Sequence, residues 1–507
     1  MTFPRHGIFI AQGAGLRMMA DLALALDMQR VGLYASHSAW YHRYLQSAPY
    51  LERPPFVVAR EWEVTQNPPP LDMAVLRRFD DRFGPGELWR ALITDRRMVL
   101  GPFATLRQDY RRRYSDEHLL RILQGHLVAF ERLWEAVQPQ CVIAYNCVTV
   151  EDYLAYLFAR AYDVPYHNLR AIKIRDYVQY EPTPRQTSHT TLPVYEKRLQ
   201  DTPDDDYTRI AREHIRHVRE QNALYEGVRK TASSEWQMQA PLKTLTGLLR
   251  QEWEYRWGAV PHDNHLVSPI RAVMTTRIIN RLRVRRHDRA LAAHYVREQD
   301  LPGMDYVFFP LHSEPEVALL VNAKPYLNQI EVVRNLASSL PVGTKLLVKD
   351  HPLAYSRRSG GYYRKLLAIP NVRLIHPSVR SRPIVQSARA VVVITGSIGL
   401  EAVIMGKPVA CLSDPPYALL PDTMVRHLSQ PDRFDRELHD LMTGYTPDEN
   451  ALEQLLAAQI SQAASVKLYS VLLGRRNVVT TGDSSYDDEI EKLAAYTRRV
   501  LSRAGTS

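Results

Sequence analysis

The chain has 507 residues, of which 45% are hydrophobic and 24% are charged, and its formal net charge is +10. This length and balance predict a soluble globular protein with two or three domains, and the positive charge favours an anionic partner such as nucleic acid, acidic lipid or a phosphorylated substrate. The three cysteines form no disulfide framework and no apolar run reaches the roughly 18 residues of a membrane span. We therefore expect a cytoplasmic protein whose membrane contact, if any, is peripheral.

The N-terminal region opens with a predicted strand at residues 6–12, a turn containing Gly13 and Gly15, a helix at 16–28 and a second strand at 31–35. This βαβ pattern predicts a parallel sheet. The glycine turn is only a fragment of a dinucleotide-binding fingerprint, because it lacks the third glycine and the acidic residue at the end of the following strand. A glycine turn facing a cleft fits equally well.

A third strand and helix unit follows a mostly helical stretch, with a strand at 142–145, a helix from about 150 to 162 and a strand at 164–169. Glu151 and Asp152 lie in the first turn of that helix and are candidate catalytic carboxylates. The helix dipole favours acidic residues there in any protein, so the structural interpretation stays open beside the catalytic one.

Between residues 182 and 302 the composition changes, with predicted helices at 207–228 and 236–257 and a basic amphipathic segment from Arg271 to Arg297. Such a segment is typical of a helix on an anionic membrane surface, but a solvated helix that links two domains explains it as well and is the more common case. Its arginines include Arg277, Arg281, Arg283, Arg285, Arg286 and Arg289. The acidic run 204–206 opens a helix rather than ending a strand, so we predict no metal site there.

The C-terminal region alternates strands and helices, with strands predicted at 306–311, 345–348, 373–375, 391–394 and 409–412, and a long helix ending near residue 340. The strand-end loops carry the sequences HSEPE, KDHP and TGS. Because the carboxyl ends of parallel strands share one edge of a sheet, these three polar loops predict a ligand site.

The loop chemistry suits a phosphate. Gly396 lets a ligand approach the backbone, and we expect Ser397 to be the N-cap of the following helix, whose free N–H groups would meet an anion. His351 can donate to a phosphate oxygen, and Lys349 adds positive charge. Glu401 lies one turn into the helix, where its carboxylate would accept hydrogen bonds from a ribose.

The order FFPLHSEPE, VKDHP and TGSIGLEAVIMGKPV resembles the C-terminal domain of capsule polysaccharide biosynthesis proteins, which include Kdo transferases and are distantly similar to polysialyltransferases. The resemblance implies a GT-B fold, with two Rossmann-like domains facing a cleft and a nucleotide-sugar donor on the second. It assigns the donor phosphate to His351 and to the hydroxyls of Thr395 and Ser397, and the ribose to Glu401. Implied domains are 1–200 for the acceptor, 201–300 as a helical linker, 301–480 for the donor, and 481–507 as a helix packing on the first domain.

The expected function is therefore sugar transfer from a CMP-Kdo-like or nucleoside diphosphate donor to a surface polysaccharide or glycolipid. Glu314, Glu316, Glu151 and Asp152 are the candidates for the catalytic carboxylate, and their ranking stays open. We expect no metal, no cofactor beyond the nucleotide-sugar co-substrate, no nucleic-acid partner, and a cytoplasmic position peripheral to the inner membrane face. A UDP-sugar 2-epimerase, a polyol-phosphate transferase of the teichoic acid type, and a non-catalytic membrane- or nucleic-acid-binding protein remain alternatives.

Overall fold

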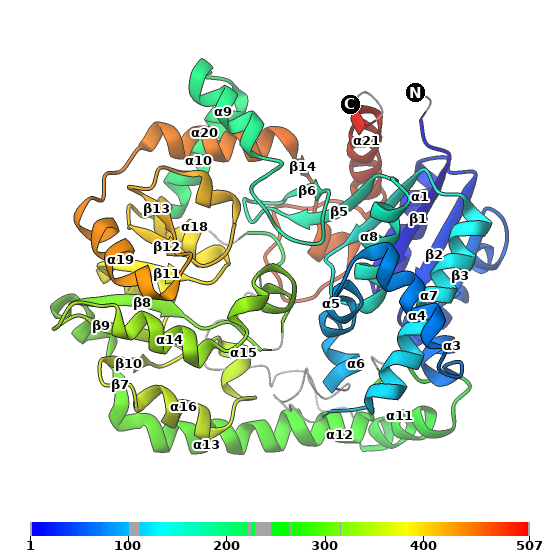
Figure 1. The fold of residues 1–507 in the computed structure, drawn as a ribbon, viewed down its shortest axis with the longest axis horizontal. Coiled ribbons are helices and arrows are strands. Elements are labelled where there is room, and N and C mark those ends of the chain that lie inside the picture. The colour runs from blue at the N-terminus through cyan, green and yellow to red at the C-terminus, as the bar shows by residue number, and fades with distance from the viewer. Residues whose placement is uncertain are drawn as a thin grey trace.

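The protein folds into two α/β domains that lie side by side, each built on one seven-stranded sheet (Figure 1). The structure, a computed structural model, describes residues 3–100, 112–221, 225–228, 245–263, 266–314 and 316–504. The predicted architecture of two Rossmann-like domains facing a cleft, with a helical middle segment, is confirmed.

The first sheet has the order β14-β6-β5-β4-β1-β2-β3. The five neighbouring strands β5, β4, β1, β2 and β3 are parallel to one another. The strands are β1 (His6–Ala11), β2 (Arg30–Ala35), β3 (Phe56–Arg60), β4 (Cys141–Tyr145), β5 (Tyr166–Ala171), β6 (Tyr177–Glu181) and β14 (Ala464–Ser465). The helices are α1 (Gly15–Ala25), α2 (Ser38–Leu45), α3 (Glu61–Gln66), α4 (Met73–Phe83), α5 (Glu87–Thr94), α6 (Arg96–Leu100), α7 (Asp116–Val137) and α8 (Val150–Ala161).

Alternation along β1 explains why helices cover both faces of this sheet. Phe9 packs in a cluster with α1, whereas Ile8 and Ile10 pack on the opposite side in a cluster with α7 and α8. Successive side chains of a strand point to opposite faces, so a strand buried on both faces reads as a continuous apolar run. That is why β1 was predictable.

The second sheet is parallel throughout and has the order β13-β12-β11-β8-β9-β10-β7. Its strands are β7 (Tyr295–Val296), β8 (Tyr306–Pro310), β9 (Lys345–Lys349), β10 (Val372–Ile375), β11 (Ala390–Val393), β12 (Val409–Cys411) and β13 (Val425–His427). The helices are α14 (Gln329–Ser338), α15 (Pro352–Tyr355), α16 (Gly360–Leu367), α17 (Ser381–Ser387), α18 (Ser397–Ile404), α19 (Phe434–Thr443) and α20 (Glu449–Gln462). Phe308 packs beneath α18 and α20, and Val307 and Phe309 pack beneath α14, α16 and α19.

The long helix predicted to end near residue 340 is wrong. In its place the chain forms the short turns η6 (Ala318–Asn322) and η7 (Lys324–Tyr326) and then α14. Pro325 has no N–H with which to continue a helical ladder, and the backbone at Ala323 is not helical, with φ −140° and ψ 48°.

The middle of the chain divides its helices between two places. Helices α9 (Leu192–Asp201) and α10 (Asp206–Glu220) pack against α20, where Ile215 and Val218 share a core cluster with Leu452. Helices α11 (Leu245–Trp257), α12 (Pro269–Val273) and α13 (Asn280–Leu291), with the π-helical turn η3 (Met274–Ile279), run along one edge of the molecule beneath both domains (Figure 1). Residues 222–224 and 236–244 of the predicted helices lie outside the described residues.

The end of the chain returns to the first domain. Strand β14 pairs antiparallel with β6, and α21 (Tyr486–Ala504) lies beside α1 (Figure 1). The Tyr486 hydroxyl donates to Asp21 Oδ2 at 2.9 Å, and the Tyr180 amide donates to the Tyr496 hydroxyl at 3.2 Å. The crossing segment between β14 and α21 borders the interdomain cleft. None of the helices in the described ranges combines the length and apolar composition that a bilayer crossing needs.

Candidate functional site

A cavity of about 580 Å³ lies between the two domains, at the carboxyl ends of strands from both sheets. The first domain contributes residues that follow β4 and β5, and the second contributes residues that follow β8, β9 and β11. Ligands of open α/β sheets bind at this edge. The lining includes Asn146, Arg170, Lys173, His312, Glu316, His351, Thr395, Gly396, Ser397, Tyr469 and Arg475. A groove of similar volume on α10 and α20 has walls of arginine–glutamate ion pairs and receives no strand end.

The N-cap of α18 in the turn after β11 is Gly396, and not Ser397 as the sequence predicted. Gly396 is the N-cap with φ 120° and ψ 176°, a conformation open essentially only to glycine, and no side chain caps the helix. A Cβ on Gly396 would lie 3.3 Å from His312 Cε1, and its carbonyl accepts from the Tyr417 hydroxyl at 2.9 Å. The first turn of α18 therefore faces the cavity beside the Ser397 hydroxyl.

His351 lines the cavity as the N-cap of α15, with Pro352 as the first helical residue. Its Nδ1 accepts a hydrogen bond from the Leu353 amide at 3.2 Å. Because Nδ1 is an acceptor, the neutral ring carries its proton on Nε2. The cap thus prepares an N–H donor, as a phosphate oxygen requires.

Arg358, which is completely buried, joins the two loops that carry His312 and His351. Its Nε donates to Asp350 Oδ1 at 3.1 Å, its Nη2 donates to the His312 carbonyl, and its Nη1 lies 3.3 Å from Glu314 Oε1. Asp350 also accepts from the His351 amide at 2.7 Å. Glu314 is thereby part of an internal ion-pair network, and it is not among the residues that line the cavity.

Glu316 is the predicted catalytic carboxylate that lines the cavity. Burial raises its pKa, and the neighbouring cations Arg96, Lys173 and Arg357 oppose that rise. A carboxylate whose pKa is raised is a better proton acceptor, and it can also act as a nucleophile.

Lys349 and Glu401 are not among the residues that line the cavity, and the charge of each affects the pKa of the other. Burial lowers the pKa of Lys349 to about 8, against the opposing effect of Glu401, and its Nζ is 3.1 Å from Ser381 Oγ. Burial raises the pKa of Glu401, while Ser397, Lys173 and Lys349 favour its charged form. Glu401 therefore acts on the cavity through Ser397 and Lys173, whereas Lys349 contacts Ser381 and acts on the charge of Glu401.

Glu151 and Asp152 are fully buried at the start of α8 and are absent from the cavity lining. Asp152 forms a capping box with Thr149, accepting from the amides of Val148 and Thr149 at 2.9 Å, and burial raises its pKa to about 6. Burial, with the nearby carboxylates Asp95 and Asp152, raises the pKa of Glu151 strongly. In this structure the two carboxylates contact the helix start and its buried neighbours.

The sequence reasoning missed the basic residues of the first domain that reach the cavity. Arg96, Arg170, Lys173 and Arg475 line it. Lys173 has a positive φ of 65°, an uncommon conformation for a side-chain-bearing residue, and burial lowers its pKa to about 8. Arg170 and Lys173 lie at and just beyond the end of β5, which was a usable signal. Arg475, stacked 4.4 Å over the Tyr469 ring, comes from the returning C-terminal segment and gave none.

Anionic groups suit this cavity better than a bound cation. Four cationic side chains and two imidazoles border it, against the carboxylate of Glu316. Within the described ranges, no group of three or more His, Cys, Asp or Glu side chains is placed to hold a metal ion.

Comparison with known proteins agrees with the resemblance seen in the sequence. Residues 259–446 match the family model "Capsule polysaccharide biosynthesis protein", which confirms that resemblance. No curated protein matches the chain.

Similar solved structures include the β-Kdo 2,7 transferase of KpsC from Thermosulfurimonas dismutans, 14% identical over 73% of this chain and 89% of that chain, with a TM-score of 0.34. The β-Kdo 2,4 transferase of the same protein is 12% identical over 65% and 82%, with a TM-score of 0.36. UDP-GlcNAc 2-epimerase from Neisseria meningitidis is 13% identical over 89% and 93%, with a TM-score of 0.26.

Proposed function

We propose that this protein is a glycosyltransferase. Its residues 259–446 match the capsule polysaccharide biosynthesis family, which supports the proposal. The protein moves a sugar from a nucleotide-sugar donor, CMP-linked as for Kdo or linked to a nucleoside diphosphate, to a surface polysaccharide or glycolipid. The interdomain cavity is the observation that supports this proposal. There, the strand ends of both sheets bring cationic and hydrogen-bond-donating side chains together with one carboxylate.

The donor phosphate occupies the part of the cavity formed by the second domain. The Nε2–H of His351, the Ser397 hydroxyl and the first turn of α18 donate to its oxygens, and the dipole of α18 favours the negative charge. These groups stabilise the charge that develops on the phosphate as the bond to the sugar breaks, which is usually the largest single catalytic contribution. We assign the ribose hydroxyls to Glu401, which would accept their hydrogen bonds from its place one turn into α18, next to Ser397 of the cavity lining.

Glu316 is the catalytic carboxylate in this proposal. In an inverting reaction it takes the proton of the acceptor hydroxyl, whose oxygen attacks the anomeric carbon while the electron pair of the broken bond leaves with the nucleotide phosphate. In a retaining reaction it attacks the anomeric carbon itself while the nucleotide phosphate leaves with the electron pair of the broken bond. The acceptor hydroxyl then displaces the carboxylate and gives its proton to the released phosphate. Arg96, Arg170 and Arg475 hold the acceptor side of the cavity.

The protein works without a resident metal in this account, because cationic side chains supply the charge that a divalent ion would bring to the phosphates. We place it in the cytoplasm, peripheral on the inner membrane face. Its three cysteines are free and buried, as suits a reducing compartment.

The test is to incubate the protein with candidate nucleotide sugars, with and without an acceptor glycan, and to measure the release of free nucleotide. The proposal predicts release that depends on acceptor and a labelled sugar that appears on the acceptor. Interconversion of a UDP-sugar without acceptor would make the protein an epimerase, and transfer of a polyol phosphate would make it a teichoic-type transferase. Glu316→Gln and the buried-site variant Glu151→Gln are compared, and loss of transfer in a folded Glu151→Gln alone would transfer the catalytic role to Glu151.

A further inference from the structure

Helix α11 carries an exposed apolar stripe. Leu245, Leu249, Trp253 and Trp257 recur every four residues, and their exposed fractions are 71%, 53%, 60% and 66%. Four residues of an α-helix span about 400°, which is about 40° more than one full turn. Each of these side chains is therefore offset by only that angle from the one before it, and the four form a row along the helix. A row of four large apolar side chains in water, two of them tryptophan, marks an interaction surface in a protein of this kind.

The turn η3 and helix α13 carry a second apolar row, and α12 and α13 add positive charge. Met274, Ile278 and Leu282 are 45%, 45% and 58% exposed at the same four-residue spacing. The arginines on the exposed side of this segment are Arg271, Arg281, Arg285, Arg286 and Arg289. We call the whole surface of α11, α12, η3 and α13 the strap face.

The acidic residues of these helices point elsewhere or are paired. Glu252 is buried and accepts from Ser268 Oγ at 2.8 Å and from the Ile270 amide at 3.1 Å. Asp288 accepts from the Tyr355 hydroxyl at 2.7 Å on the side of the second domain, and the exposed Glu254 is paired with Arg250 at 2.9 Å. The strap face therefore combines apolar anchors with a net positive charge.

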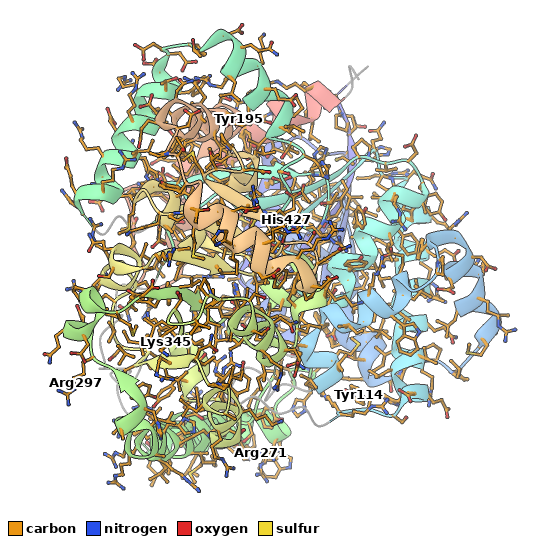
Figure 2. All side chains as sticks on the ribbon, turned by 60° about the vertical axis from the view of Figure 1, so that its left-hand side comes forward. Tyr114, Tyr195, Arg271, Arg297, Lys345 and His427 are labelled. Atoms are coloured by element: carbon orange, nitrogen blue, oxygen red, sulfur yellow. The ribbon has the colours of Figure 1, made fainter. Side chains whose placement is uncertain are left out.

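The strap face is held by both domains. Before α12, Asp263 accepts from the amide of Ser38 in the first domain. From α13, Arg283 donates to the carbonyls of Ser356 and Arg357 in the second domain at 3.1 and 3.0 Å. The helices accordingly line one long edge of the molecule, and Figure 2 places Arg271 at its lower margin.

From this geometry we infer that the strap face docks on an anionic lipid bilayer, with Trp253, Trp257 and their leucine neighbours at the headgroup level and the arginines on lipid phosphates. Tryptophan is favoured at the membrane–water interface, and basic amphipathic helices lie in that plane on anionic lipids. This rests on the membrane-peripheral part of the proposed function and supplies its surface, but it does not depend on catalysis.

The experiment is co-sedimentation of the full chain with vesicles of phosphatidylcholine and phosphatidylglycerol at 7:3, and with vesicles of phosphatidylcholine alone. We expect the wild type to bind the anionic vesicles, and added salt to weaken that binding. Trp253→Ser/Trp257→Ser should bind these vesicles more weakly, on the order of ten-fold or more. The triple variant Arg285→Gln/Arg286→Gln/Arg289→Gln should lose the preference for anionic over neutral vesicles.

Matched controls alter the same residue types elsewhere on the surface. Trp89→Ser removes a tryptophan that is 49% exposed on α5, and Arg77→Gln/Arg132→Gln/Arg436→Gln removes three exposed arginines outside the strap. Both should bind like the wild type. Three results would overturn the inference. The wild type could bind both vesicle types equally, or the control variants could lose as much binding as the strap-face variants. The protein could also form concentration-dependent dimers that Trp253→Ser/Trp257→Ser abolishes. Vesicle binding without any sugar transfer would leave it standing while the proposed function fell.

Discussion

Replacing Arg358 with alanine should destabilise the second domain more than any surface change. The guanidinium is completely buried between Asp350 and Glu314, which are themselves buried, and it stacks 4.2 Å over the Tyr362 ring. Removing it leaves two buried carboxylates without their cation, which costs about 3–5 kcal/mol. For a domain of this size each kcal/mol lowers Tm by about 2–4 °C, so the expected loss is about 6–20 °C.

The assay is thermal unfolding followed by circular dichroism at one protein concentration and pH. Arg334→Ala is the matched control, because Arg334 forms an exposed pair with Glu331 at 3.2 Å and should change Tm by no more than a degree or two, roughly the worth of a surface pair. Arg358→Met/Asp350→Asn/Glu314→Gln should recover part of the loss, since it removes all three charges together. A Tm for Arg358→Ala that matches Arg334→Ala would refute the reasoning.

Three further predictions concern the cavity. Glu316→Gln should lower kcat by about 10²–10⁴-fold while nucleotide affinity, measured by calorimetry, stays within a few-fold, as expected for a lost base or nucleophile. Burial lowers the pKa of Lys349 and of Lys173 to about 8, so both side chains lose their charge as pH rises and nucleotide affinity should fall between pH 7 and 9. Lys349→Met/Lys173→Met should flatten this pH dependence of the nucleotide affinity. An unchanged pH dependence in that variant would contradict the prediction. Gly396→Ala should cost about 1–3 kcal/mol and weaken nucleotide binding, whereas Gly303→Ala, in open space, should do neither.

The parallel core strands and their end loops were predictable because their signals are local. β8 is an aromatic run, β9 a leucine and valine run and β11 a β-branched run, and polar residues begin within two positions of the end of each strand. Since parallel strands place those residues at one edge, the sequence could bring His351, Glu316 and Gly396 together without coordinates.

Other features depended on contacts between distant parts of the chain. The N-cap role belongs to Gly396 because its φ of 120° is compatible with glycine, whereas the sequence pattern favoured the neighbouring serine. Glu314 looked as free as Glu316 until Arg358, 44 residues further on, was seen to hold it. Arg475 reaches the cavity only because the end of the chain crosses back to the first domain, which no local pattern encodes.

The most direct test of the central claim is calorimetric titration of CMP, CDP, UDP, GDP and ADP into the wild type and His351→Ala. The account predicts that one nucleotide binds the wild type and that the variant binds it at least ten-fold more weakly, because it loses a charge-assisted bond of about 1.5–3 kcal/mol. The same ligand at 100 times its Kd should stabilise the wild type by about 2.7 kcal/mol. If no nucleotide binds, or if His351→Ala binds it as tightly as the wild type, the cavity is not the donor site.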